Sequence, residues 1–418
     1  MKAVGKYLAV FLTLIAAYIL FGLASGLVSD KAVERHVRQT IDQTDLKGDF
    51  WFAFLYKPNY YMDNFTDALI VNQAWCLGEE DSLNLWQRVM LVPRQKGGGE
   101  ECESLRRLAE GDTTMQVVYY PRYWHGSTFL MRFLLAIDDY VVLRTLFYLL
   151  SSLLLLWVVL ALAKRAGVGP AMIYGLSLTL TDVFMMQFSI QFLPVLLLTL
   201  IGSLGVIYGT KTKTKTGTKT KTGTGIGVLF FVIGSLTAYF DLLTAPLMTW
   251  GIPLLVWVVV EGPKGLGTKN KLSTLNSQLS TLTWFLGYGA TWAAKWLLAT
   301  LTTPMNVFAD ASQQASLRAA VEDYSRWDAV ARNLELVQWL YVTIVAGVLL
   351  LFALRHFNGK GWKKALMCLA VAATPLAWYL ALGNHSYIHF WFTYRSLAVT
   401  VMGLLFAVAS LREVRTKK

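Results

Sequence analysis

The chain has 418 residues, of which 55% are hydrophobic and only 15% are charged, and its mean hydropathy is +0.46. Soluble domains carry about a quarter charged residues, so this composition excludes an ordinary soluble protein and indicates an integral membrane protein. The net charge of +12 does not indicate a nucleic-acid binder, because the cations lie between apolar segments and form no basic stripe on one folded face.

The first predicted element is an apolar stretch over residues 7–28, close to the length of about 20 residues that a spanning helix needs. Lys2 and Lys6 precede this stretch. A cleaved signal peptide is the alternative, but no clear small-x-small cleavage site precedes Asp30. We therefore predict a retained transmembrane helix within residues 1–28.

A polar region follows at residues 29–138, and its length of about 110 residues is enough for a small folded subdomain. Helical patterns cover residues 33–41 and 59–75. Cys76 and Cys102 are the only cysteines of this region, which we place outside the cytoplasm, where disulfides persist. We predict that these two cysteines pair, with two free thiols as the alternative.

Asp63 and Asp67 lie in the run Asp-Asn-Phe-Thr-Asp within this region. A spacing of i to i+4 places two carboxylates on one face of a helix. Such a pair, at the outer rim of a bilayer, is a candidate for general-base chemistry on a lipid-borne substrate. A solvated helix face is the structural alternative.

Nine further apolar segments follow, so the whole chain is predicted to be an all-α polytopic membrane protein with about ten transmembrane helices and a large first extracytoplasmic loop. These segments form a membrane bundle over residues 139–418 and cover 140–162, 168–187, 189–208, 225–240, 243–260, 281–302, 336–354, 364–382 and 391–411. With both termini in the cytoplasm, 20 of the 38 Lys and Arg residues fall on the inside, beside only Glu261 and Glu413. This distribution follows the positive-inside rule.

Two connecting segments of the bundle have distinct predictions. The Lys-Thr repeat at 210–224 is of low complexity, so we expect a disordered cytoplasmic loop. The external segment at 303–335 is rich in alanine and has a helical period, which suggests an amphipathic helix lying over the bundle.

Three more polar clusters fall at the same outer boundary in this topology, and polar groups at a membrane mark a site when they converge. They contain Arg122, Trp124 and His125; Asp241; and Asn384, His385, His389, Tyr394 and Arg395. Arginine and histidine cations can hold a phosphate diester while aromatic side chains pack a prenyl chain. An interfacial aromatic belt is the alternative for the aromatic members. His385 and His389 also have the spacing of a metal pair, but no adjacent carboxylate completes a known pattern, so no metal ligands are predicted.

This arrangement resembles the membrane-embedded glycosyltransferases of the GT-C superfamily. The resemblance covers most of the chain at the level of topology, and is carried further by Asp-Asn-Phe-Thr-Asp-Ala-Leu, Arg-Tyr-Trp-His-Gly, Tyr-Phe-Asp-Leu-Leu-Thr-Ala-Pro and Asn-His-Ser-Tyr-Ile-His with Phe-Thr-Tyr-Arg. It implies an inverting transfer of a sugar from a polyprenyl-phosphate donor, with an aspartate as the general base. The aspartates lie some 35 residues beyond the first helix, so Asp49, Asp63 and Asp67 stay open as the base.

By this resemblance, each candidate site residue takes a role. Asp67 or Asp63 is the base, and Asp241 orients the acceptor or holds a divalent cation, the one cofactor left open. The donor phosphate is bound by Arg395, His389, Arg122 and His125, and the site is completed by Asn384, His385, Tyr394 and Trp124.

The expected partners are the lipid-linked sugar donor, a glycan, lipid or protein acceptor and the membrane lipids, with no nucleic acid. The expected location is the bacterial inner membrane, with the active face outside the cytoplasm. A transporter or flippase for a lipid-linked glycan, and a glycan polymer ligase or acyltransferase, are the alternative functions.

Overall fold

The computed structural model describes residues 2–43, 46, 48–52, 55, 57–79, 82–209, 223–266, 280–321, 323–355 and 361–411. The chain begins with α1 (Lys2–Gly26). The outer subdomain comprises α2 (Asp30–Gln43), β1 (Phe50–Phe52), η1 (Pro58–Tyr60), β2 (Tyr61–Asp63), α3 (Asn64–Glu79), α4 (Leu85–Leu91), β3 (Pro93–Lys96), α5 (Glu101–Glu110), β4 (Gln116–Tyr119) and α6 (Gly126–Leu135).

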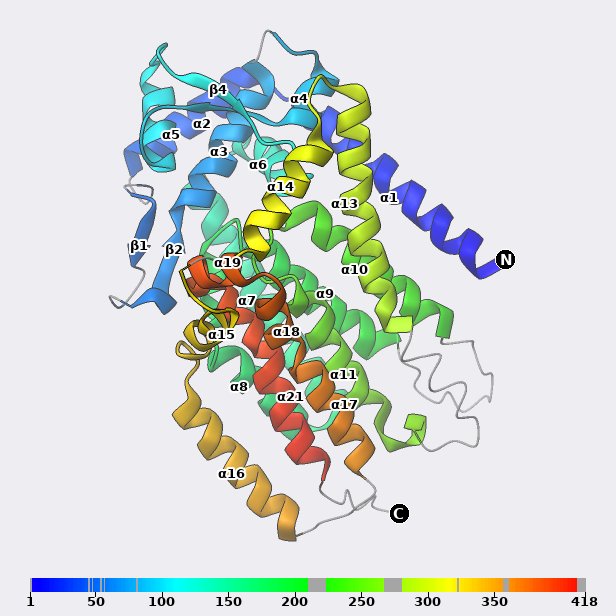
Figure 1. The fold of residues 1–418 in the computed structure, drawn as a ribbon. Coiled ribbons are helices and arrows are strands. Elements are labelled where there is room, and N and C mark those ends of the chain that lie inside the picture. Colours follow the sequence, from blue (N-terminus) through cyan, green and yellow to red (C-terminus); the bar gives the residue numbers. More distant parts are fainter. Residues whose placement is uncertain are drawn as a thin grey trace.

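The bundle follows the outer subdomain along the chain, and most of it lies below that subdomain in Figure 1, with α13 and α14 reaching up beside it. It comprises α7 (Tyr140–Ala166), α8 (Val168–Thr179), η2 (Val183–Phe188), α9 (Leu193–Gly209), α10 (Gly223–Phe240), α11 (Leu247–Leu266), η3 (Ser280–Leu282), α13 (Thr283–Thr302), α14 (Val307–Ala319), α15 (Arg326–Leu334), α16 (Trp339–Arg355), α17 (Trp362–Ala372), α18 (Thr374–Ala381), α19 (Gly383–Ile388), α20 (Phe390–Thr393), η5 (Tyr394–Ser396) and α21 (Leu397–Ser410).

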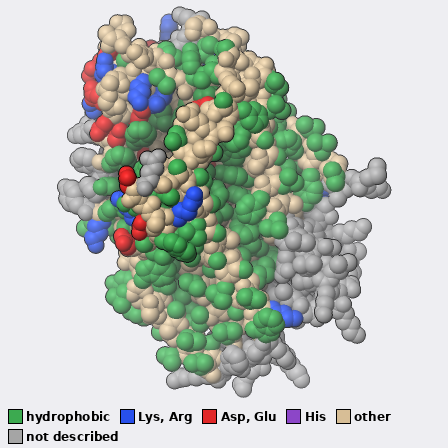
Figure 2. Space-filling model, viewed as in Figure 1, with side chains coloured by type: hydrophobic (Ala, Val, Ile, Leu, Met, Phe, Trp, Pro, Cys, Tyr) green, Lys and Arg blue, Asp and Glu red, His purple; other side chains and the backbone are tan. Residues whose placement is uncertain are grey.

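Several of these helices are long and apolar enough to cross a membrane, as expected for a helical membrane protein. Four qualify within the described residues, namely Val4–Gly26, Tyr140–Ala166, Trp362–Ala381 and Phe390–Ser410, and the bent pair of α15 and α16 makes a possible fifth. The total of ten spans stays a prediction, because Val168–Thr179 and Leu193–Gly209, for example, are shorter than 18 residues. Figure 2 shows apolar side chains over most of the bundle and charged ones mainly over the outer subdomain and near α15.

The outer subdomain is not purely helical, so the expected all-α class is too simple here. β1 pairs antiparallel with β2, and β3 with β4. Valine, tyrosine and phenylalanine favour strands, and Phe50 in β1 and Val117 and Val118 in β4 are of these types. The buried core of the subdomain includes Tyr140 and Leu143 of α7, so it packs against the bundle.

The predicted helix at 59–75 begins later than expected. Residues 58–63 form η1 and β2, and α3 starts at Asn64. The Asp63 carboxylate accepts a hydrogen bond from the Thr66 N–H (3.0 Å), which satisfies one of the free donors at the start of α3. Asp63 therefore lies outside the helix, and the prediction that it shares a helical face with Asp67 is wrong.

Three other predictions concern the segments 33–41 and 303–335 and the Lys-Thr repeat. The helix expected at 33–41 is confirmed as part of α2. The single helix expected over 303–335 is instead two helices, α14 and α15. The Lys-Thr repeat falls largely at 210–222, outside the described residues.

The predicted disulfide is not formed, and the helical geometry explains why. The Cys76 thiol donates a hydrogen bond to Asn72 Oδ1 near the middle of α3. The Cys102 thiol instead lies against the backbone carbonyl of Asn64, at the start of the same helix. Twelve residues of helix separate Asn64 from Cys76, which is about 18 Å and far beyond the reach of a disulfide.

We therefore expect all three cysteines to be reduced in the purified protein. When protein prepared without reductant is unfolded in the presence of a maleimide, mass spectrometry should show three labelled thiols, at Cys76, Cys102 and Cys368. A single labelled thiol, rising to three only after reduction, would contradict this structure.

Candidate functional site

Asp67, the first candidate base, is fully engaged in holding the fold together. Its carboxylate accepts hydrogen bonds from the Tyr140 hydroxyl (2.6 Å), the Ser189 hydroxyl (2.8 Å) and the N–H groups of residues 190 and 191 (3.0 Å each). A carboxylate offers about four acceptor positions, and these donors occupy all of them. Asp67 thus joins α3 to α7 and to the segment before α9, with only 1% of its surface exposed.

Asp63 and Asp49 also bind backbone groups. Asp63 is buried at the start of α3, and burial, with a smaller contribution from neighbouring Asp67, raises its pKa to about 7. The Asp49 carboxylate accepts from the N–H groups of Glu101 and Cys102, where α5 begins. Asp49, Asp63 and Asp67, the three candidates for the base, therefore each stabilise the start of a helix or a junction between elements.

Arg395 and Tyr394 form a separate junction between the outer subdomain and the bundle. Arg395 donates through Nη2 to the backbone carbonyl of Asn59 (2.9 Å). The Tyr394 hydroxyl and the Asn59 amide both donate to Asp182 Oδ2 (3.1 and 2.8 Å). Arg395 lies over the ring of Phe192 and is not part of the cavity described next.

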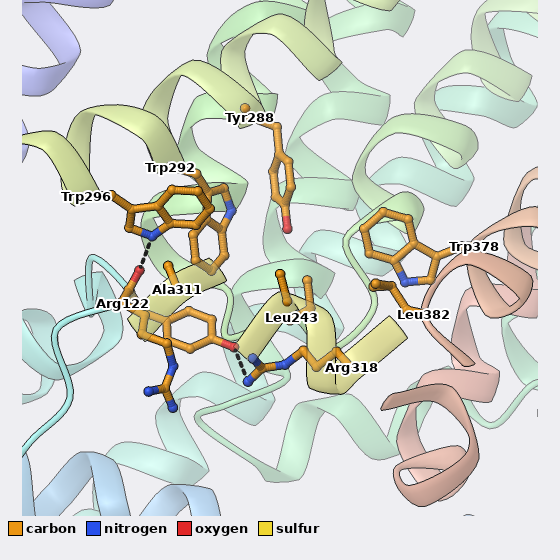
Figure 3. Close-up of a pocket in the computed structure, with 12 residues that line it drawn as sticks. Arg122, Leu243, Tyr288, Trp292, Trp296, Ala311, Arg318, Trp378 and Leu382 are labelled. Atoms are coloured by element: carbon orange, nitrogen blue, oxygen red, sulfur yellow. Dashed lines mark hydrogen bonds between the residues drawn. The ribbon is translucent and has the colours of Figure 1, made fainter. Parts of the chain in front are cut away.

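The structure contains a cavity of about 360 Å³, and of the remaining candidates Arg122 lines it. It lies between α13, α14, the turn before α11 and the end of α18 (Figure 3). Its wall consists of aromatic, small and cationic side chains: Arg122, Tyr123, Leu243, Tyr288, Gly289, Trp292, Trp296, Ala311, Ala315, Arg318, Trp378 and Leu382.

An aromatic row along α13 forms one wall of this cavity. Trp284, Tyr288, Trp292 and Trp296 follow one another at intervals of four residues, so they share one helical face. Successive ring centroids are 4.8, 6.2 and 5.5 Å apart. The last three of these rings line the cavity. This regular spacing is visible in the sequence, and our sequence analysis missed it.

The two arginines of the cavity differ in their partners. Arg122 donates through Nη1 to both carboxylate oxygens of Asp310 (3.0 Å each), so its charge is compensated. Arg318 of α14 donates instead to the Tyr123 hydroxyl (3.2 Å) and to a backbone carbonyl within its own helix, as Figure 3 shows for the tyrosine. Within the described part of the chain, no carboxylate lies within 4.0 Å of the Arg318 guanidinium.

Arg318 is therefore a cation of the cavity wall that carries no counter-charge from the described residues. Sequence analysis placed Arg318 on an amphipathic segment but assigned it no role. Its position facing the cavity depends on α14 packing against α13 and α19, which the sequence alone does not reveal.

Asp241 lies in the turn between α10 and α11, next to the cavity. Its Oδ1 accepts hydrogen bonds from the N–H (3.0 Å) and the hydroxyl of Thr244. Asp241 interacts electrostatically with Tyr123 and Tyr288, two phenols of the cavity wall. Burial raises the pKa of Asp241 to about 6. Asp241 is 2% exposed and does not line the cavity, whereas Leu243 of the same turn does.

The histidines contribute shape and hydrogen bonds but no charge at neutral pH. The rings of His385 and His389 lie 4.9 Å apart near the cavity, and His125 Nε2 is 2.7 Å from the backbone carbonyl of Tyr120. Burial lowers the pKa values of His385, His389 and His125 to about 3, 4 and 3. These rings are thus neutral at pH 7, contrary to the expectation that they supply positive charge to a phosphate.

Two further candidates act as supports of the cavity. Asn384 donates through its amide to the carbonyl of Leu317 (2.8 Å), which fixes the end of α14. The Trp124 indole donates to the carbonyl of Thr291 (2.7 Å) and so anchors α13. No group of three His, Cys, Asp or Glu side chains suited to a metal ion occurs within the described ranges.

Comparison with protein-family models, curated proteins and solved structures gives no match. The class of the protein is therefore defined by its own fold and cavity. The described chain is mostly helical, with several helices able to cross a membrane, and its aromatic cavity contains one guanidinium group without a carboxylate partner among the described residues.

Proposed function

We propose that the protein is a membrane glycosyltransferase that moves a sugar from a polyprenyl-phosphate donor to an acceptor. The observation that carries this proposal is the cavity wall, which combines Tyr288, Trp292 and Trp296 with the cation of Arg318. Aromatic faces bind the apolar faces of sugars and prenyl units, and a guanidinium binds a phosphate oxygen pair. The resemblance to the GT-C superfamily supports the same reaction class.

Arg318 is the phosphate-binding residue in this proposal. Its Nη2 already donates to the Tyr123 hydroxyl, so guanidinium and phenol face the same space and can hold neighbouring phosphate oxygens. Arg122 is neutralised by Asp310, so among the described residues of the cavity wall Arg318 carries the positive charge that faces the ligand. A single charge fits the single negative charge of a phosphodiester better than the larger charge of a diphosphate.

Asp241 is the general base in this proposal, in place of Asp63 and Asp67. A base works best when its pKa lies near the working pH, and burial raises the pKa values of Asp63 and Asp241 to about 7 and 6. Asp241 is preferred because it interacts with Tyr123 and Tyr288 of the cavity wall. The carboxylate takes the proton of the acceptor hydroxyl as the hydroxyl oxygen attacks the anomeric carbon. The bond to the phosphate oxygen breaks in the same step, with inversion, and polyprenyl phosphate leaves beside Arg318.

Access to Asp241 requires a movement of Leu243. This residue has a φ of 73°, a conformation that costs a non-glycine residue about 1–3 kcal/mol, and strained residues of this kind cluster at sites that move or bind. Rotation of the Leu243 side chain, with the backbone of the turn unchanged, would open the cavity toward the carboxylate.

The proposal includes the membrane setting. We place the chain in the bacterial inner membrane with about ten spans, both termini in the cytoplasm and the cavity on the outer side. The acceptor is a glycan, a lipid or a protein of the cell envelope.

We expect Arg318→Ala to weaken donor binding about 10- to 100-fold, because a charge-assisted hydrogen bond contributes about 1.5–3 kcal/mol. Arg318→Lys should retain part of this affinity, since it keeps the charge but loses the planar fork. The measurement is tryptophan fluorescence of nanodisc-embedded protein titrated with synthetic polyprenyl-phosphate sugars, because three tryptophans line the cavity.

Arg38→Ala is the matched control, since Arg38 forms an exposed ion pair with Glu34 in α2 and should not affect binding. A polyprenol-linked sugar without phosphate should bind equally weakly to wild type and to Arg318→Ala. Equal donor affinity in wild type and Arg318→Ala, or the absence of sugar transfer from every polyprenyl-phosphate donor, would overturn the proposed function.

A further inference from the structure

The turn that carries Asp241 is held in a strained shape by a residue from a distant part of the chain. Leu243 lies in the left-handed region with a φ of 73°. A leucine is rare in this conformation, because its Cβ crowds the backbone there. Such a residue persists only when its surroundings hold it in place.

His385 of α19 provides that constraint. Its Nε2 lies 2.9 Å from the backbone carbonyl of Leu243, although 142 residues separate the two in the sequence. The carbonyl can only accept, so Nε2 carries the hydrogen and donates it. His385 is buried beside the rings of His389 and Phe392, and Arg318 is its charged neighbour.

Leu243, with its left-handed backbone conformation, also orients the hydrogen-bond donors that face Asp241. The N–H and hydroxyl of Thr244 both point to Asp241 Oδ1, and the turn closes through Leu243. If Leu243 relaxed to a negative φ, the peptide planes on either side of it would rotate, and these donors would turn away from the carboxylate.

We propose that His385 is a positioning residue for Asp241: its Nε2–H holds the carbonyl of Leu243 and so keeps the turn at 241–244 in the shape that directs the Thr244 donors at the carboxylate. The role in catalysis rests on the proposed function, in which Asp241 is the base. The positioning itself can be measured without any transferase activity.

The expected consequence of losing this hydrogen bond has a definite sign. Hydrogen bonds from Thr244 and the turn backbone favour the ionised carboxylate and oppose the effect of burial. Their loss therefore raises the pKa of Asp241 further. Among the described residues, Tyr123 and Tyr288 interact electrostatically with Asp241, and both remain neutral below pH 9, so their ionisation does not overlap its titration.

The test is an infrared pH titration of the full chain in nanodiscs, with ¹³C-labelled aspartate and the Asp241→Asn spectrum to assign the band. Wild type should titrate near pH 6. His385→Phe should raise the midpoint by about one pH unit, the equivalent of one lost hydrogen bond. His385→Gln should titrate as wild type, because its amide can donate to the same carbonyl. His389→Phe, which alters the neighbouring ring, should leave the midpoint unchanged.

Leu243→Gly separates positioning from general damage to the fold. Glycine adopts a positive φ without steric cost, so the turn no longer needs the histidine. In the Leu243→Gly background, His385→Phe should therefore shift the midpoint much less and should fold even if the single variant does not. Equal midpoints in wild type and His385→Phe, or an undiminished shift in the glycine background, would overturn the proposal whether or not the protein transfers sugar.

Discussion

Asp241→Asn is expected to slow sugar transfer by about three orders of magnitude, because a positioned general base contributes about 10²–10⁴-fold to a rate. The amide keeps an oxygen that can accept from the N–H and hydroxyl of Thr244, so the turn should retain its shape. Donor affinity should change little, since the phosphate is bound by Arg318. The measurement is the initial rate with polyprenyl-phosphate sugars and a cell-envelope extract as the source of acceptor.

The same assignment predicts the pH dependence of wild type. Only the ionised carboxylate accepts a proton, and burial raises the pKa of Asp241 to about 6, so the rate should fall as the pH decreases through 6. Ionisation of a carboxyl with a raised pKa costs folding stability as the pH rises through that value. Asn avoids this cost, and Asp241→Asn should be at least as stable as wild type at pH 7.

Asp112→Asn is a suitable control, because Asp112 is a carboxylate of the outer subdomain that pairs with Arg107, away from the cavity. It should transfer sugar at the wild-type rate. A full rate in Asp241→Asn, or a rate that stays constant between pH 5 and 7, would show that the base lies elsewhere.

Asp67→Ala is expected to lower the free energy of unfolding by about 3–5 kcal/mol. The substitution leaves four buried donors without their acceptor, and each unsatisfied buried group costs about 1–3 kcal/mol, partly recovered by relaxation. Asp67→Asn should cost less, because one oxygen still accepts from two donors. The measurement is chemical or thermal unfolding in detergent.

Glu34→Ala provides the comparison for this stability change. Glu34 forms an exposed ion pair with Arg38, and such pairs contribute about 0–1 kcal/mol. A loss of stability in Asp67→Ala no larger than in Glu34→Ala would contradict the bridging role. Wild-type stability combined with lost transfer would instead restore Asp67 as a catalytic candidate.

The local pattern of the sequence predicted some helices of the bundle well, whereas the span expected at 168–187 is instead the shorter α8 followed by η2. Apolar length alone located α7 and α13, which span Tyr140–Ala166 and Thr283–Thr302 against the expected 140–162 and 281–302. Short strands were missed, because three or four residues carry too little periodicity to distinguish β1 from a loop. The disulfide prediction was wrong because the spacing of cysteines in the sequence does not reveal which part of α3 each thiol contacts.

The candidate site was predicted in part. Arg122 lines the cavity, and Asp241 lies next to it. His385 binds the backbone of the turn that contains Asp241, and Asn384 binds the end of α14, which forms part of the cavity wall. Arg395 and Asp67 instead join elements far apart in the sequence. A pattern shows that a polar residue is buried at a boundary, but its partner, such as residues 189–191 for Asp67, is set by packing between distant segments.

The bridge made by Asp67 also has a consequence for biosynthesis. The chain leaves the ribosome from the N-terminus, and α3 is complete more than a hundred residues before Ser189 and Gln191 are made. Until then, the Asp67 carboxylate lacks the Ser189 hydroxyl and the N–H groups of residues 190 and 191, and only the Tyr140 hydroxyl can donate to it. The outer subdomain therefore reaches its final structure only after the segment preceding α9 has been synthesised and docked against it, so maturation of this region follows, and does not precede, assembly of the first part of the bundle.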